Sequence, residues 1–88
     1  MNFNKNVILI VDDTPINLKV LSDFLKFYGF KLLVAEDGKT ALNIAEHASP
    51  DLILLDVLMP EIDGFETCRL LKTNPATQEI TVRKKERS

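Results

Sequence analysis

The chain alternates short apolar runs with longer segments in which apolar residues recur at every third or fourth position. Val7–Val11, Lys31–Ala35 and Leu52–Leu55 are largely apolar runs with no regular polar alternation. Such runs predict strands that are buried on both faces of a parallel sheet. The segments between them predict amphipathic helices, because their apolar positions form one stripe along a helical surface.

Residues with known preferences for helix ends mark where these helices begin and stop. Thr14 and Pro15 suit the N-cap and first turn of one helix, and Gly29 suits its end. Asp37 is expected to cap a second helix, and Pro75 ends a third. The apolar stripe of the first helix comprises Ile16, Val20, Leu21, Phe24, Leu25 and Tyr28. The second helix is expected over about 39–48 and the third over about 65–73.

Strands that alternate with helices predict an α/β fold with a parallel sheet and right-handed crossovers. A fourth strand begins at Ile80–Val82, and from Arg83 onward the chain becomes charged. We therefore expect an α/β domain over residues 1–82, followed by a short basic tail over residues 83–88.

Length and composition narrow the class of protein. The 88 residues suffice for one domain, and a hydrophobic content of 45% is that of a folded protein. No apolar run approaches the roughly 18–20 residues that a membrane-spanning helix needs. Cys68 is the single cysteine, so an internal disulfide is excluded and a reducing, cytoplasmic location is expected.

The charges are unevenly distributed along the chain. Residues 1–82 hold seven basic and twelve acidic residues, and residues 83–88 hold four basic residues and one acid. The acidic body would repel phosphates, and no aromatic residue lies among the charges of the tail. This distribution argues against a nucleic-acid partner and favours a solvated polar tail.

Acidic residues follow two of the predicted strands directly. Asp12 and Asp13 come after the first strand, and Asp56 ends the third. In an open parallel sheet, ligands bind at the carboxyl ends of the strands. Any one of these acids alone would be interpreted as a cap or turn residue, but three together repel one another by several kcal/mol. A hard cation such as Mg²⁺, which needs one or two carboxylates, would relieve this repulsion.

The same residues carry a family resemblance. Val7–Asp13 followed by Thr14-Pro15-Ile16-Asn17, and the string LLDVLMPEIDGFE over residues 54–66, resemble the receiver domain of two-component response regulators. The resemblance extends from about Val7 to about Val82. It implies a flavodoxin-like open parallel sheet with strand order 2-1-3-4, and it makes residues 1–82 a partial receiver that lacks the fifth strand and the last helices.

The resemblance also implies a role for each residue of the acidic site. Asp56 matches the phospho-acceptor, which takes a phosphoryl group from a histidine kinase or a phosphotransfer protein. Asp12 and Asp13 match the acidic pair that positions Mg²⁺, with Asp13 as the direct ligand. The backbone carbonyl of Leu58 matches a third protein ligand. Such a domain is a signalling module and not an enzyme, with at most weak self-phosphorylation and dephosphorylation.

Two positions of the family have no match in this chain, and other functions stay open. The Ser or Thr after strand four and the Lys after strand five are absent, so we expect impaired switching. An alternative is a non-catalytic association module, a homodimer for example, that pairs through an exposed sheet edge. A Mg²⁺ phosphatase that uses Asp56 is disfavoured, because such enzymes commonly have a second Asp two residues later, where this chain has Leu58.

Overall fold

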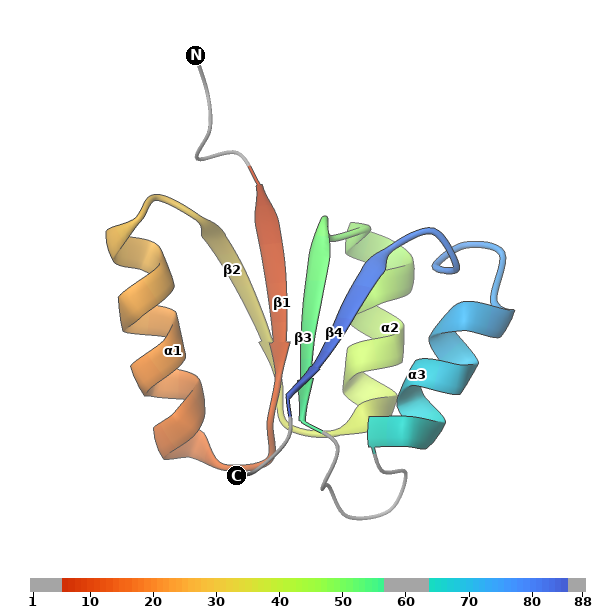
Figure 1. Cartoon of the computed structure of the whole chain (residues 1–88), viewed down its shortest axis with the longest axis horizontal. Helices are drawn as coiled ribbons and strands as arrows, with labels where there is room; N and C mark the ends of the chain where they lie inside the picture. The colour runs from red at the N-terminus through yellow and green to blue at the C-terminus, as the bar shows by residue number, and fades with distance from the viewer. Residues whose placement is uncertain (1–5, 57–63, 86–88) are drawn as a thin grey trace.

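The computed structural model describes residues 6–56 and 64–85, which form a parallel sheet with helices on both faces (Figure 1). The strands are β1 (Val7–Val11), β2 (Lys31–Ala35), β3 (Leu52–Asp56) and β4 (Thr81–Lys85). The helices are α1 (Pro15–Phe27), α2 (Gly38–Ala48) and α3 (Gly64–Thr73). The strands are all parallel, in the order β2-β1-β3-β4. This architecture confirms the predicted flavodoxin-like fold class and strand order.

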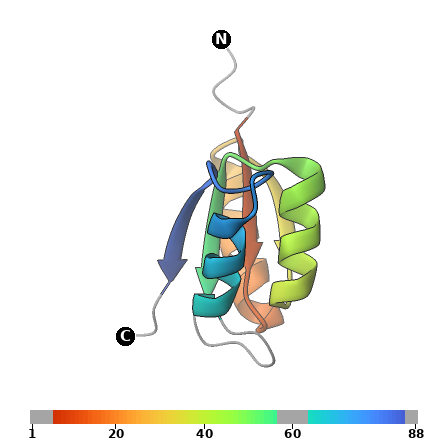
Figure 2. The same ribbon diagram turned by 90° about the vertical axis from the view of Figure 1, so that its right-hand side faces the viewer.

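The helices form two layers around the sheet. Helix α1 lies on one face, and α2 and α3 lie together on the other (Figures 1 and 2). Each face has its own apolar core. The core beneath α2 and α3 contains Leu9, Val11, Ala35, Ala41, Ala45, Ile53, Leu55 and Leu71. The core beneath α1 contains the buried residues Ile8, Ile10 and Leu18, with Leu21, Leu25, Phe30, Leu32, Leu52 and Leu54 packed against them.

The ends of the helices largely follow the predicted pattern. Asp37 caps α2, and its Oδ1 accepts a hydrogen bond of 2.7 Å from the backbone N–H of Thr40. Gly29 has a φ of 90°, a conformation that costs glycine little, and it follows the end of α1 as expected. Thr14 occupies the N-cap of α1, but its hydroxyl makes no capping hydrogen bond.

The face that α1 buries differs from the predicted stripe. Leu21 and Leu25 pack toward the sheet together with Leu18, while four other residues of the stripe are 58–71% exposed. These four are Ile16, Val20, Phe24 and Tyr28. The apolar arc of α1 is wider than the sector that touches the sheet, and no other described element covers the rest. Phe65, an aromatic residue at the start of α3, is also 56% exposed.

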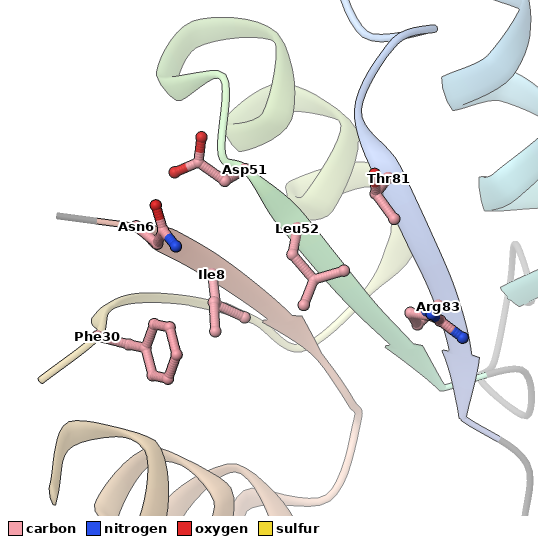
Figure 3. Close-up of a pocket in the computed structure, with 7 residues that line it drawn as sticks. All are labelled: Asn6, Ile8, Phe30, Asp51, Leu52, Thr81 and Arg83. Atoms are coloured by element: carbon pink, nitrogen blue, oxygen red, sulfur yellow. The ribbon is translucent and has the colours of Figure 1, made fainter. Parts of the chain in front are cut away.

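Strand β4 continues beyond the last apolar residue of its sequence. Arg83, Lys84 and Lys85, the first residues of the expected basic tail, lie within the strand and pair in register with Leu54, Leu55 and Asp56. Backbone hydrogen bonds hold this ladder, so it does not require apolar side chains. Val82 and Ile80 still pack on the α2–α3 side of the sheet. On the α1 side, Thr81 and Arg83 lie beside Leu52 (Figure 3). Within the described residues, no further strand pairs with the outer edge of β4.

Candidate functional site

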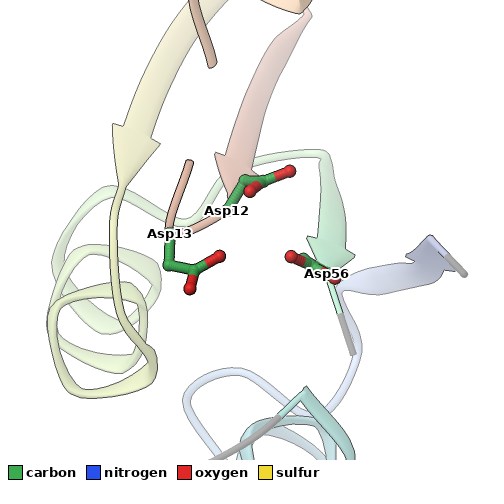
Figure 4. Close-up of side chains that lie close together, drawn as sticks. All are labelled: Asp12, Asp13 and Asp56. Carbon is green, nitrogen blue, oxygen red and sulfur yellow. The ribbon is translucent and has the colours of Figure 1, made fainter. Parts of the chain in front are cut away.

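Three carboxylates meet at the carboxyl edge of the two central strands. Val11 of β1 is in register with Leu55 of β3, so the residues that follow, Asp12 and Asp56, are neighbours across the sheet. Asp13 comes next in the chain, and Figure 4 shows its side chain pointing toward the same space. One oxygen from each of the three residues lies within 4.8 Å of the others. The structure thus brings together the three acids that the sequence predicted.

The three acids differ in their surroundings. Asp12 is 1% exposed and Asp56 is 4% exposed, while Asp13 is half-buried. The Oδ1 atom of Asp12 accepts a hydrogen bond of 2.9 Å from the backbone N–H of Thr14. Its Oδ2 atom accepts one of 3.3 Å from the side-chain amide of Asn17. These bonds fix the orientation of the Asp12 carboxylate and bind the first turn of α1 to the site.

The sequence interpretation did not assign a role to Asn17. Pro15 fixes the start of α1, and Asn17 therefore lies in its first turn, next to the end of β1. A polar side chain at that position can reach back to the residue that ends the preceding strand. The sequence signal for this contact was therefore the spacing of five residues between Asp12 and Asn17. Leu58, expected to offer its carbonyl, lies outside the described residues.

The donor set fits a hard divalent cation. All three residues offer carboxylate oxygen, which Mg²⁺ and Ca²⁺ prefer, and the cluster contains no nitrogen or sulfur ligand. Mg²⁺ holds its ligands at about 2.0–2.1 Å, so two oxygens of one octahedral shell lie roughly 3–4 Å apart. Separations of up to 4.8 Å suit direct contact by part of the set and contact through water by the rest.

Glu66 and Arg69 form an ion pair on α3, so their charges offset each other. The guanidinium of Arg69 donates a hydrogen bond of 2.9 Å from Nε to Oε1 of Glu66. This contact holds the pKa of the Glu66 carboxyl below its usual value and raises the pKa of Arg69. Both groups are solvent-accessible, so water screens the pair, and its net charge is zero.

A doubly wound parallel sheet with three acids at the ends of its central strands defines a domain of the flavodoxin-like class with an acidic cluster at its carboxyl edge. Residues 8–86 match the family model described as "Response regulator receiver domain". The chain therefore belongs to the response regulator receiver family, which confirms the resemblance predicted from its sequence motifs. Receiver domains are signalling modules of two-component systems that pair with histidine kinases or phosphotransfer proteins, and they are not conventional enzymes.

Similar proteins support this assignment at the level of sequence and structure. The chain is 47% identical over 75 residues to the response regulator PleD of Caulobacter vibrioides. The matched region covers 85% of the chain and 16% of PleD. A solved receiver domain from Methanoculleus marisnigri superposes with a TM-score of 0.87 at 38% identity, over 89% of this chain and 63% of that one.

A third similar protein is the receiver domain of a sensor histidine kinase from Pseudomonas aeruginosa. Its structure was solved with a magnesium ion coordinated in the active site cleft. It superposes with a TM-score of 0.86 at 28% identity, over 91% of this chain and 66% of that one. The chain thus spans a small part of PleD and just under two thirds of the two solved receivers. In the described segments, no helix combines the length and apolar character needed to cross a bilayer.

Proposed function

We propose that this receiver domain accepts a phosphoryl group on Asp56 in a Mg²⁺-dependent reaction. The donor is the phosphohistidine of a histidine kinase or of a phosphotransfer protein. The observation that carries the proposal is the position of Asp56, which is buried at the end of a central strand with oxygens of Asp12 and Asp13 within 4.8 Å. A single buried carboxylate would be a structural residue, but three at one sheet edge form a site for a cation and an anionic substrate.

The transfer is a substitution at phosphorus. A carboxylate oxygen of Asp56 forms the new P–O bond while the P–N bond to the histidine ring breaks. The ring reacts in its cationic form, with a proton on the nitrogen that does not bear the phosphoryl group, so it keeps the electron pair of the broken bond and leaves as neutral imidazole. The product is an acyl phosphate on Asp56. When bound, Mg²⁺ supplies positive charge that offsets the repulsion between the carboxylates and the incoming phosphoryl oxygens.

The chain's own groups divide the remaining tasks. Both oxygens of Asp12 accept hydrogen bonds, from Thr14 and Asn17, so we assign Asp12 to orienting the site and to holding the cation through water. Asp13 is less buried, and we assign it as the direct ligand. Asp56 serves as both acceptor and ligand, and the carbonyl of Leu58 completes the proposed protein ligands. The lone Cys68 is free, which suits a reducing cytoplasmic setting.

The test is covalent labelling of the 88-residue chain with acetyl phosphate and Mg²⁺, followed by intact mass measurement. We expect the mass of one added phosphoryl group, which disappears when EDTA replaces Mg²⁺. Borohydride reduction converts an aspartyl phosphate to homoserine, so peptide mass spectrometry then identifies the acceptor. The expected modified residue is Asp56.

Two variants make the labelling experiment decisive. Asp56→Asn should remove the adduct, while Asp23→Asn should label like the wild type because Asp23 is an exposed residue of α1, paired only at the surface with Lys19. An adduct that persists in Asp56→Asn would overturn the acceptor assignment. Complete absence of an adduct from a folded wild-type chain would overturn the proposed transfer.

Association through the outer edge of β4 is a second candidate function. The edge strand lacks a partner within the described residues, and such an edge can pair with another chain. However, Arg83 and Lys84 are exposed on this strand. In a symmetric pairing of two copies these cations would face one another, and charged residues are a common protection of natural sheet edges. This feature weighs against β4 as the surface on which two copies meet.

A further inference from the structure

Two polar side chains at the start of α1 point back toward the acidic site. The side-chain amide of Asn17 donates a hydrogen bond of 3.3 Å to Oδ2 of Asp12, and the hydroxyl of Thr14 lies 3.5 Å from Oδ1 of Asp13. Thr14 occupies the N-cap position, where a hydroxyl commonly accepts a hydrogen bond from the helix backbone, but it makes no such bond. Both side chains therefore contact the acid pair.

The Asp12 carboxylate is held at both of its oxygens. Oδ1 accepts a hydrogen bond of 2.9 Å from the backbone N–H of Thr14, and Oδ2 accepts the one from Asn17. Asp12 is 1% exposed, so little solvent competes for these oxygens. The Thr14 donor belongs to the backbone, whereas the Asn17 donor belongs to a side chain. Asn17 thus provides a restraint on Asp12 that a substitution can remove.

We propose that Asn17 is a positioning residue that makes the acidic site prefer Mg²⁺ to Ca²⁺, because it restrains the orientation of Asp12. This role rests on the proposed Mg²⁺ site. It adds a selectivity that the donor set alone does not give, since carboxylate oxygen suits both cations. Groups that hydrogen-bond to metal-binding residues orient these residues, and their loss commonly costs roughly 10–100-fold in metal affinity.

The two cations make different demands on Asp12. Mg²⁺ requires a near-ideal octahedral shell and keeps several of its waters, so it suits a fixed carboxylate that contacts it through water. Ca²⁺ takes about six to eight oxygens in a flexible arrangement and accepts both oxygens of one carboxylate. To present both oxygens to one ion, Asp12 must turn, and that turn competes with the hydrogen bonds from Thr14 and Asn17. The restraint therefore disfavours a ligand arrangement that Ca²⁺ uses.

The Asn17 amide restrains Asp12 without changing the charge of the site. An amide group offers two N–H donors and carries no charge. Lys or Arg at this position would place a positive charge beside the carboxylate and would oppose the binding of a cation. Asp at this position would add a fourth negative charge to a cluster of three. A neutral donor is therefore the type of group that fixes Asp12 and leaves the three carboxylates available to the ion.

The selectivity is tested by urea unfolding of the whole chain. Unfolding in EDTA, and in series of MgCl₂ and CaCl₂ concentrations at constant ionic strength, gives the dissociation constant of each cation from the stability that it adds. Asn17→Leu keeps nearly the same side-chain size but removes the donor. It should weaken Mg²⁺ binding about tenfold and change Ca²⁺ binding by less than about threefold, so the preference for Mg²⁺ should fall at least about threefold. A loss of fold stability alone would leave this preference unchanged, because it affects both salt series equally.

Asn43→Leu is the matched control. Asn43 is an exposed residue of α2, which lies on the opposite face of the sheet from α1. The same substitution there should leave both dissociation constants within a factor of about two. An Asn17→Leu chain that keeps the wild-type preference for Mg²⁺ would overturn the proposed role of Asn17. A wild type that binds Ca²⁺ as tightly as Mg²⁺ would also overturn it.

The selectivity and the proposed phosphoryl transfer can fail independently. If Asp56 is labelled but Asn17→Leu keeps the wild-type preference, the positioning role of Asn17 alone is wrong. If the preference falls in Asn17→Leu but the wild type acquires no phosphoryl group, the acceptor role of Asp56 alone is wrong. A folded wild type that neither cation stabilises would overturn the cation site on which both proposals depend.

Discussion

The same side chain, aspartate, occupies three positions of the acidic site and meets three different environments. Asp12 is buried and held by the backbone of Thr14 and the amide of Asn17. Asp56 is buried at the end of β3, and Asp13 is open to solvent on one side. Substitutions at the three positions should therefore differ in their consequences, although each removes the same charge.

Asp13→Asn should separate metal binding from folding. Without Mg²⁺, it removes one of three repelling charges and should raise the free energy of unfolding by about 1 kcal/mol. Mg²⁺ at ten times its dissociation constant should stabilise the wild type by about 1.4 kcal/mol, and the variant should lose most of this gain. Urea unfolding with MgCl₂ or with EDTA measures both effects, with Asp23→Asn as control. An unchanged Mg²⁺ response in Asp13→Asn would contradict the proposal that Asp13 is the direct ligand.

At the scale of elements, strands and helix ends were predictable from local chemistry, while buried faces were not. The all-apolar strands and the cap at Asp37 depend on residues close in sequence, and they appear where expected. The exposed side of α1 depends on which elements cover it. No local pattern distinguishes Phe24, which is exposed, from Leu25, which packs on the sheet.

The acidic site shows the same division between local and global information. The convergence of Asp12 and Asp56 followed from the alternation of strands and helices, because parallel strands end at one edge. The contact between the Asn17 amide and Asp12 depends on the direction in which the Asn17 side chain points. Composition and periodicity do not give that direction. The extension of β4 through Arg83 and Lys84 was also hidden, since backbone pairing alone holds these residues in the strand.

The N-cap of α2 gives a pH-dependent prediction. The hydrogen bond from the Thr40 N–H holds the pKa of the Asp37 carboxyl below its usual value. Asp37→Ala should cost about 1 kcal/mol at pH 7. Because the pKa of Asp37 is lower in the folded state, ionised Asp37 adds a pH-linked stabilisation that is fully present above the pKa of the unfolded state. This stabilisation is lost as the pH falls through the pKa of the folded state. The difference in the free energy of unfolding between the wild type and Asp37→Ala should therefore decrease as the pH falls from about 5 to about 2, which urea unfolding measures.

The matched control for the cap is Glu36→Ala. Glu36 is the exposed acid that precedes Asp37, and its removal should change the free energy of unfolding by less than about 0.5 kcal/mol. Because Asp37 is accessible to solvent, screening keeps the pH-linked part of its effect below the total cost of the substitution. A cost of Asp37→Ala that stays constant across this pH range would exclude an ionised cap.

At the scale of the whole molecule, the two faces of the sheet are unequally covered. Among the residues that the structure describes, the α2–α3 face buries eight apolar residues in one cluster, whereas three are buried on the α1 face. A chain of 88 residues is expected to be stable by only about 4–13 kcal/mol. Within the described residues, the α1 face therefore contributes less apolar burial to this stability than the α2–α3 face.

A pair of identical substitutions compares the two faces. Ile53 and Ile10 lie in neighbouring central strands, are almost completely buried, and point into the α2–α3 core and the α1 core respectively. Each change to alanine should cost about 2–5 kcal/mol. Ile53→Ala should cost more, because the two helices around it leave less freedom to fill the cavity. Urea unfolding of dilute, monomeric protein measures the loss in the free energy of unfolding for both variants. Equal losses would contradict the inference that the two faces of the sheet are packed to different degrees.

The strand order also has a kinetic consequence. Strand β1 emerges first during synthesis, yet its second neighbour, β3, follows only after two helices and another strand. The β1–β3 pairing therefore closes a long loop and should form late, since distant contacts are slow to assemble. Asp12 and Asp56 come together only in that step. A Mg²⁺ ion held between them would thus report, during refolding, the moment at which the two central strands join.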